Sequence, residues 1–494
     1  MYSLYICYFT FGFCLSFGSI AMNFEMMDSL KFTPVEMTMS YGVMAAPWCI
    51  KPVFGMISDK YKIIDWGKRR PYIFFCGFLL AYLYMMVPKL VETKESMVGT
   101  MTFISFLMCF ADVCADCITV DYAKRELERG RTQGNCWTSR ALGSVVGAMF
   151  GGSCYDQFGT KVVFQIMSLP CLLMAMLVWQ LQINITPSAN DICKKICKSV
   201  YKKRPLAFAI FAMSIGPNYA PFYTYYLRKE LKYSPVDFQW ISIASAWSFL
   251  AATFIYKQFL LGTNPLKLME ISVYVGVCCQ LIQLLVVTKT ITSLWIVVLD
   301  TIGESLFGIL MLMPLIVAVA HHAKDGIEGT FYALLMALSN LSTVIADEIG
   351  GLIGNLLGVT RDNFDNMVFL IIICALSDLA FQLWVIKNKH VAVYFQAAKS
   401  SKDRKISHRK KGQLENPGGT DHTLERLADL DHTPVMLDVN TSGREGMEAD
   451  SEDLLETTEE NLDEKDHMPA TVVERVQNFA SMVMPPSGYR AVRE

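Results

Sequence analysis

The sequence predicts an all-α membrane protein, with twelve transmembrane helices in two pseudo-symmetric six-helix bundles and a polar C-terminal tail. Two observations carry this prediction. Apolar stretches of membrane-spanning length recur up to about residue 387, and a short motif occurs twice among them. Composition agrees, because 53% of the residues are hydrophobic and the mean hydropathy is +0.33. A soluble protein could not bury so much apolar surface.

The repeated motif indicates an internal duplication. Leu-Lys-Phe-Thr-Pro-Val-Glu occupies residues 30–36, and Leu-Lys-Tyr-Ser-Pro-Val-Asp occupies residues 231–237. Each copy predicts a helix start, with Thr33 or Ser234 as the N-cap, proline at the first helical position and an acidic residue at the third to complete a capping box. The chain therefore contains two homologous halves.

Twelve apolar stretches are long enough to cross a bilayer, which takes about 20 helical residues. Six lie on each side of a polar loop that begins near residue 184. We predict the spans at residues 3–24, 34–57, 71–88, 97–121, 134–154, 162–183, 204–227, 236–256, 267–287, 292–320, 329–357 and 366–386.

The spans divide the chain into four predicted parts. An N-terminal bundle covers residues 1–183, a cytosolic linker 184–203 and a C-terminal bundle 204–387. The remaining residues, 388–494, are polar and charged, with a basic run followed by an acidic run. Such a segment cannot pack a core, so we expect a disordered cytosolic tail.

Loop charges predict the orientation. The loops after even-numbered spans hold about twice as many lysines and arginines as those after odd-numbered spans. Because basic loops stay in the cytosol, both termini are predicted to be cytosolic. The plasma membrane is the favoured location, with an organellar membrane as the alternative.

The loop between the second and third spans suggests a gate. It carries Gly55 and Asp59, then the basic residues Lys68, Arg69 and Arg70, and it resembles the signature loop of the major facilitator superfamily. Glycine lets two helices approach closely, and the aspartate can bind a helix terminus or the basic cluster, which would hold the cytosolic side shut. The alternative is that the basic residues only anchor helices at the membrane surface.

Ionisable side chains inside spans are the sharpest functional signal. Each costs about 2.5–3.5 kcal/mol at the bilayer centre and is therefore usually functional or paired. The predicted spans contain Lys51, Asp112, Asp116, Arg140, Asp300 and Glu304. The fourth and tenth spans each hold two acids four residues apart, which lie on one helical face.

The depth of these side chains separates two roles. From the rise of about 1.5 Å per residue, Asp116 and Arg140 each lie about 9 Å below the cytosolic surface, so they can form an ion pair with a purely structural role. Asp112, Asp300 and Glu304 lie nearer the midplane. There they are candidates for proton exchange or for binding an amidine-like group of a substrate.

Motifs in both halves resemble the folate-biopterin transporter family. They are Ala-Pro-Trp-Cys-Ile-Lys-Pro-Val-Phe-Gly at 46–55, Ala-Asp-Val-Cys-Ala-Asp at 111–116, Cys-Trp-Thr-Ser-Arg-Ala-Leu-Gly at 136–143 and Gly-Ile-Glu-Gly-Thr-Phe-Tyr-Ala-Leu-Leu-Met at 326–336. The resemblance implies the major facilitator fold and transport of folates, reduced pterins or, in some lineages, S-adenosylmethionine. The first span matches the family poorly, which leaves the substrate open.

A pterin-like solute fits the charged residues. A carboxylate can bind the amino edge of a pterin with two parallel hydrogen bonds, and a glutamyl tail requires a cation. We expect Asp112 or Asp300 to hold the ring edge and Lys51 and Arg140 to attract the tail, with proton exchange at Asp116 or Glu304. Tyr219 and Tyr223, with the neighbouring Phe222, are candidates for stacking on the ring, although packing beside prolines explains them equally well.

Other activities are disfavoured. The sequence shows no nucleotide-binding loop, hydrolase elbow or metal-ligand cluster, so we predict no enzyme, catalytic residue, metal or cofactor. The expected partners are a small-molecule substrate, protons and the lipid bilayer, with no nucleic acid, and the expected state is a monomer. Two alternatives remain: a transporter of S-adenosylmethionine or another nucleoside-like solute, and a receptor or scaffold that binds without transport.

Overall fold

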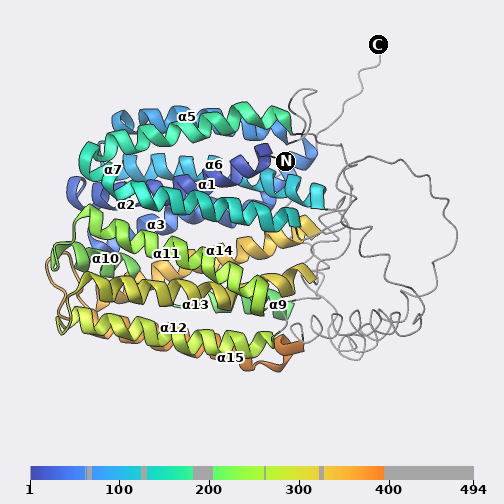
Figure 1. Ribbon diagram of the computed structural model, residues 1–494. Coiled ribbons are helices and arrows are strands. Elements are labelled where there is room, and N and C mark those ends of the chain that lie inside the picture. The colour runs from blue at the N-terminus through green and yellow to red at the C-terminus, as the bar shows by residue number, and fades with distance from the viewer. Residues whose placement is uncertain are drawn as a thin grey trace, which may run out of the picture. The chain divides into compact units, whose positions relative to one another are not determined.

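The structure, a computed structural model, describes residues 2–61, 63, 69–123, 131–181, 204–260, 263–321 and 328–393. Within these ranges all regular secondary structure is helical, which confirms the predicted all-α class. Figure 1 shows the helices lying side by side, with those of the first half in blue to teal and those of the second half in green to orange. The predicted linker lies outside the described residues, and so does almost all of the predicted tail, from residue 394 onward.

The N-terminal half supplies six spans. Its elements are α1 (Tyr2–Phe17), α2 (Ser19–Phe24), η1 (Glu25–Ser29), α3 (Pro34–Cys49), α4 (Lys51–Lys60), α5 (Arg70–Leu90), α6 (Lys94–Ala123), α7 (Arg131–Leu177) and η3 (Val178–Gln180). The first span comprises α1, α2 and η1, and the second comprises α3 and α4. Helix α7 contains two spans, because Gly159 has a left-handed φ of 73° that breaks the helix between them.

The C-terminal half supplies the other six. Its elements are α9 (Arg204–Met213), α10 (Ala220–Lys229), α11 (Pro235–Ile255), η4 (Tyr256–Leu260), α12 (Pro265–Val287), α13 (Leu294–His321), α14 (Glu328–Leu356) and α15 (Met367–Lys387). The seventh span is interrupted between α9 and α10, where Gly216 and Pro217 lie in non-helical backbone. That interruption lies beside one of the two cavities described below.

The repeated motif folds the same way in both halves. Thr33 Oγ1 accepts the Glu36 N–H at 3.2 Å, and the Glu36 carboxylate accepts the Thr33 N–H at 2.7 Å. Ser234 and Asp237 form the same capping box with the same two distances. The lysine two residues before each N-cap has a left-handed φ, 56° in the first copy and 58° in the second. The predicted helix starts are confirmed, and both halves make this turn by one mechanism.

Helix α1 packs closely against the first span of α7. Gly143, Gly147 and Gly151 recur every fourth residue and bring the α7 backbone against α1. A Cβ added at Gly147 would lie 2.7 Å from the carbonyl oxygen of Phe13, so no larger residue fits without a shift of the backbone. Small residues at this spacing let membrane helices approach closely, and here they fix the helix that carries Arg140.

The two halves are joined at the ends of the spans that the loop charges predict to be non-cytosolic. Asp28 of η1 accepts hydrogen bonds from Arg228 at 2.7 Å and from Lys229 at 3.0 Å. The hydroxyl of Tyr225 donates to the carbonyl oxygen of Phe32. We call these five residues the outer gate. Farther in, α3 packs on α14 and α7 packs on α11.

Candidate functional site

A cavity of about 650 Å³ lies between the two halves. We call it the central cavity. Elements α1, α2, α3, α4, α6 and α7 line one side, and α11 and α14 line the other. Its lining residues are Leu15, Ser16, Ser19, Trp48, Lys51, Asp112, Asp116, Trp137, Arg140, Ser144, Ser242, Ser245, Ala246, Phe249, Met336 and Asn340. Every charged side chain of this lining belongs to the N-terminal half.

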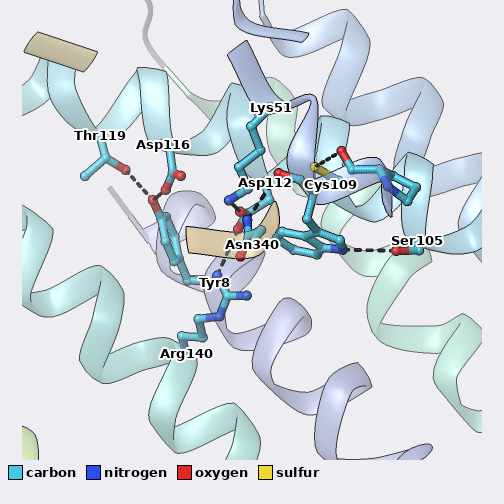
Figure 2. Close-up of polar contacts among 11 residues, drawn as sticks. Tyr8, Lys51, Ser105, Cys109, Asp112, Asp116, Thr119, Arg140 and Asn340 are labelled. Atoms are coloured by element: carbon cyan, nitrogen blue, oxygen red, sulfur yellow. Dashed lines mark hydrogen bonds and ion pairs between the residues drawn. The ribbon is translucent and has the colours of Figure 1, made fainter. Parts of the chain in front are cut away.

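Three of the predicted residues form one charge cluster. Asp112 is 1% exposed; its Oδ2 accepts a hydrogen bond from Lys51 Nζ at 2.8 Å, and its Oδ1 accepts one from Arg140 Nη1 at 2.9 Å (Figure 2). The cluster carries a net positive charge, because two cations share one carboxylate. The predicted pairing of Arg140 is therefore corrected: its ionic partner is Asp112, one helical turn deeper than Asp116.

Asp116 is held by a neutral donor. The Tyr8 hydroxyl donates to Asp116 Oδ1 at 2.5 Å and lies 3.2 Å from Thr119 Oγ1 (Figure 2). No sequence pattern singled out Tyr8, which is an aromatic residue in an apolar span like many others. Asp116 thus lines the central cavity as an acid for which the described residues supply no ion pair.

Two tryptophans form walls beside the cations. Lys51 Nζ lies 4.6 Å from the ring centre of Trp48, and the Arg140 guanidinium carbon lies 5.6 Å from that of Trp137. Trp48 is held from both halves, because its indole N–H donates to Ser105 at 3.0 Å and Asn340 donates to its carbonyl oxygen at 3.1 Å. Both tryptophans lie within the family-like motifs, yet their residue type alone indicated no role.

The other predicted residues lie in a second cavity of about 320 Å³, which we call the C-terminal cavity. Tyr219, Tyr223, Asp300 and Glu304 line it, and the remaining lining residues also come from the C-terminal half. Gln283 Nε2 donates to Asp300 Oδ2 at 2.8 Å and lies 3.4 Å from Glu304 Oε2. The structure therefore separates into two cavities what the sequence suggested as one site. The reason is that α13 packs against α11 and α12 of its own half.

Asp378 is a residue that the sequence reasoning missed. It lies in the middle of the twelfth span, lines the C-terminal cavity and accepts a hydrogen bond from Gln280 Nε2 at 3.0 Å. An added Cβ at Gly216 would overlap its carboxylate, so the break in the seventh span makes room for this acid. The signal was present, because an aspartate inside a span is the feature that identified Asp300.

The predicted cytosolic gate is only partly described. Arg69 Nη1 donates to the carbonyl oxygen of Cys117 at 3.1 Å, and Arg70 begins α5. A Cβ added at Gly55 would meet Val113 at 3.8 Å, an ordinary contact, so the packing there does not require glycine. Lys68 and the Asp59 side chain lie outside the described residues. The gate stays a prediction.

A family model described as the BT1 family matches residues 12–404. The chain belongs to the BT1 family. The BT1 chain is 28% identical over 388 residues to the folate-biopterin transporter of Synechocystis sp. (strain ATCC 27184 / PCC 6803 / Kazusa), covering 75% of this chain and 78% of that protein. It is 26% identical over 394 residues to the probable folate-biopterin transporter 2 of Arabidopsis thaliana, covering 72% and 76%. These matches confirm the resemblance that the sequence motifs indicated.

Solved structures confirm the fold of this BT1 chain. The crystal structure of a D-xylose-proton symporter aligns with a TM-score of 0.62 at 13% identity, over 79% of this chain and 98% of that one. A nucleoside transporter aligns with a TM-score of 0.59 at 15% identity, over 80% and 99%. At these identities the likeness establishes the fold alone, the twelve-span major facilitator fold. The protein is an integral, multi-pass membrane protein of a transporter family.

Proposed function

We propose that this chain is a secondary active transporter that carries folate, biopterin or a related pterin through the central cavity by alternating access. The observation that carries the proposal is the Lys51–Asp112–Arg140 cluster between Trp48 and Trp137, in a cavity lined by both halves. Two homologous membrane halves around such a site are the architecture of a secondary transporter. The folate and biopterin named for the relatives supply the substrate class.

The chemistry of the cluster suits an anionic substrate with a flat ring. Lys51 and Arg140 share one carboxylate, so an incoming glutamyl carboxylate can replace part of their pairing with Asp112 without leaving a buried charge alone. The tryptophan faces offer stacking surfaces for the ring. Asp112 then acts as the counter-ion that positions both cations. Asp116, whose side-chain donor among the described residues is Tyr8, takes over from Asp112 as the acid proposed to bind the pterin edge.

The orientation and coupling belong to the same proposal. We place both termini in the cytosol of a plasma-membrane monomer, which puts the outer gate on the extracellular side. The described conformation then has its halves joined on the outside. Uptake is driven by a cation gradient, with protons as the first candidate because carboxylic acids line both cavities.

The test compares two substrates that differ in charge. In cells that cannot make folate, uptake of labelled folate and labelled biopterin is measured for the wild type, Lys51→Met and the matched variant Lys94→Met at equal surface expression. Lys94 pairs with Glu36 at a partly exposed site at the start of α6, about five helical turns before Asp112, so its loss should change neither uptake. Lys51→Met should lower folate uptake by about tenfold or more and leave biopterin uptake nearly unchanged, because biopterin lacks the glutamyl carboxylates.

The outcomes separate the rival functions. Equal loss of both substrates would remove Lys51 from tail binding. Inhibition by S-adenosylmethionine but by neither folate nor biopterin would replace the substrate class. Specific binding of labelled folate without any uptake would favour a receptor.

A further inference from the structure

The C-terminal cavity holds buried polar atoms that have no partner in the described part of the chain. They are Tyr219 Oη, Tyr223 Oη, Gln280 Oε1, Gln283 Oε1 and Asp300 Oδ1. Four of the five parent side chains are more than nine-tenths buried, since Asp300 is 3%, Gln283 4%, Tyr219 6% and Tyr223 8% exposed. Buried polar atoms are normally hydrogen-bonded, and each orphan costs about 1–3 kcal/mol. Orphans gathered around one void therefore point to something that binds there.

The orphan atoms share one chemical character, because they are oxygens. Both glutamine side chains turn their N–H groups to carboxylates, Gln283 to Asp300 at 2.8 Å and Gln280 to Asp378 at 3.0 Å, and their carbonyl oxygens have no partner among the described residues. Asp300 Oδ1 can only accept while the acid is ionised, and a tyrosine oxygen keeps a lone pair for an acceptor role. The cavity is thus rich in electron-pair donors and poor in cations.

The charge of the lining points the same way. Asp300, Glu304 and Asp378 contribute three carboxylates, and the lining described for this cavity contains no lysine, arginine or histidine. The central cavity is the opposite case, since Lys51 and Arg140 neutralise Asp112 there. Carboxylates within a membrane protein require a counter-charge or a proton, because burial of an unpaired charge is costly.

We propose that the C-terminal cavity is a binding site for a monovalent cation, Na⁺ or H⁺, separate from the central cavity. Oxygen ligands from carboxylate, amide and tyrosine suit a hard cation. Within the described residues no set of three or more His, Cys, Asp and Glu side chains is close enough to hold a metal ion by itself, which disfavours a tight divalent site. Asp300 Oδ1 and Gln283 Oε1 are the principal ligands.

For the proton form of this proposal, the surrounding titratable groups matter as much as Asp300. Glu304 lies one turn away on α13, and Phe238 and Ile241 of α11 present no charge. The titratable groups on the other elements around the cavity are Tyr219, Tyr223, Cys279, Asp347, Cys374 and Asp378.

The location of the site connects it to the central cavity. On α11, Ile241 lines the C-terminal cavity and the next residue, Ser242, lines the central cavity. On α14, Thr343 lines the former and Asn340 the latter. A cation bound to Asp300 of α13 and Gln283 of α12 thus lies beside α11 and α14, the two helices that also form walls of the central cavity. Coupling of the two sites rests on the proposed function, whereas cation binding does not.

The test measures cation binding directly, without transport. Purified full-length protein in lipid nanodiscs is titrated with ²²Na⁺ at constant ionic strength with choline. Carboxyl protonation is followed in parallel by infrared difference spectra between acidic and alkaline sodium-free buffers. The variants are Asp300→Asn, Tyr219→Phe and Asp116→Asn, the last being the matched change in the central cavity. Thermal unfolding of each variant verifies that it is folded.

Saturable ²²Na⁺ binding that Asp300→Asn lowers by about tenfold or more, that Tyr219→Phe lowers by less and that Asp116→Asn leaves intact would establish the sodium form. A protonated-carboxyl band lost in Asp300→Asn and kept in Asp116→Asn, without ²²Na⁺ binding, would establish the proton form. Neither signal in the folded wild type, or equal signals in wild type and Asp300→Asn, would overturn the proposal. Because no substrate is added, these results do not depend on whether the protein carries folate.

Discussion

The two cavities show how equivalent helices of a duplicated protein come to do different things. The fourth and tenth spans each carry two acids four residues apart. In the first half, Asp112 meets Lys51 of the second span and Arg140 of the fifth. The eighth and eleventh spans, their counterparts in the second half, contain no lysine or arginine, so Asp300 meets Gln283 instead. The aspartate of this pair is neutralised by protein cations in the first half, whereas in the second half we propose that a bound cation neutralises it.

The largest expected effect on stability comes from comparing the same change, aspartate to asparagine, made separately in each cavity. Asp112→Asn leaves Lys51 and Arg140 buried without a carboxylate, which should lower the free energy of unfolding by about 3–5 kcal/mol. Asp300→Asn removes a charge that no cationic side chain among the described residues balances, so in sodium-free buffer it should have little effect or stabilise the protein. Denaturant unfolding of both variants in nanodiscs measures the difference. An equal loss in the two variants would contradict the contrast between the cavities.

A smaller effect on stability is expected when one tyrosine hydroxyl is removed from each of the two sites. Tyr8→Phe removes a hydroxyl that donates to Asp116, whereas Tyr219→Phe removes one that has no partner in the described part of the chain. We expect Tyr8→Phe to cost about 1.5–3 kcal/mol of stability, because a hydrogen bond to a buried charged group is lost, and Tyr219→Phe to cost almost nothing or to stabilise. Thermal unfolding at equal lipid composition checks this order. A larger cost for Tyr219→Phe would show that its hydroxyl has a partner, contrary to the proposed open cation site.

The sequence predicted the fold more completely than it predicted the site. Hydrophobic spans and the capping boxes at Thr33 and Ser234 depend on local sequence, so they predicted the helices and the duplication. Insertion cost identified Lys51, Asp112 and Arg140 as special, because a charge in lipid is expensive wherever the helix packs. Which acid faces which cation depends on helix rotation and neighbours, and this is why the pairing of Arg140 and the separation of Asp300 needed the structure.

The same distinction explains which functional residues the sequence did not reveal. Tyr8, Trp48 and Trp137 belong to apolar or aromatic residue types that are common in any span, and only their contacts with Asp116, Lys51 and Arg140 set them apart. The sequence shows which spans contain a charge that is costly to bury. It does not show which side chain from another helix pairs with that charge. A search of each span for single polar residues, glutamine included, would have added Gln280 and Gln283 to the candidates.

The smallest effect on stability, and the last test of the comparison, concerns the outer gate. The Asp28 pairs with Arg228 and Lys229 join the two halves at partly exposed positions, so Asp28→Asn should cost only about 0–1 kcal/mol of stability. Its effect on conformation should be larger, since we propose that these contacts hold the outer side closed. Loss of these pairs should raise the labelling of a cysteine placed at Ser144, in the central cavity, by a membrane-impermeant reagent added outside cells.

A cysteine placed at Thr301, in the C-terminal cavity, is the matched probe. If only the central cavity alternates between the two sides of the membrane, Asp28→Asn should leave the labelling of this second cysteine unchanged. Labelling at both probes would mean that the C-terminal half itself opens, and the cation site would then lie on the substrate route. Labelling at neither would show that the Asp28 pairs do not hold the outer side shut, because the cavity would stay closed without them.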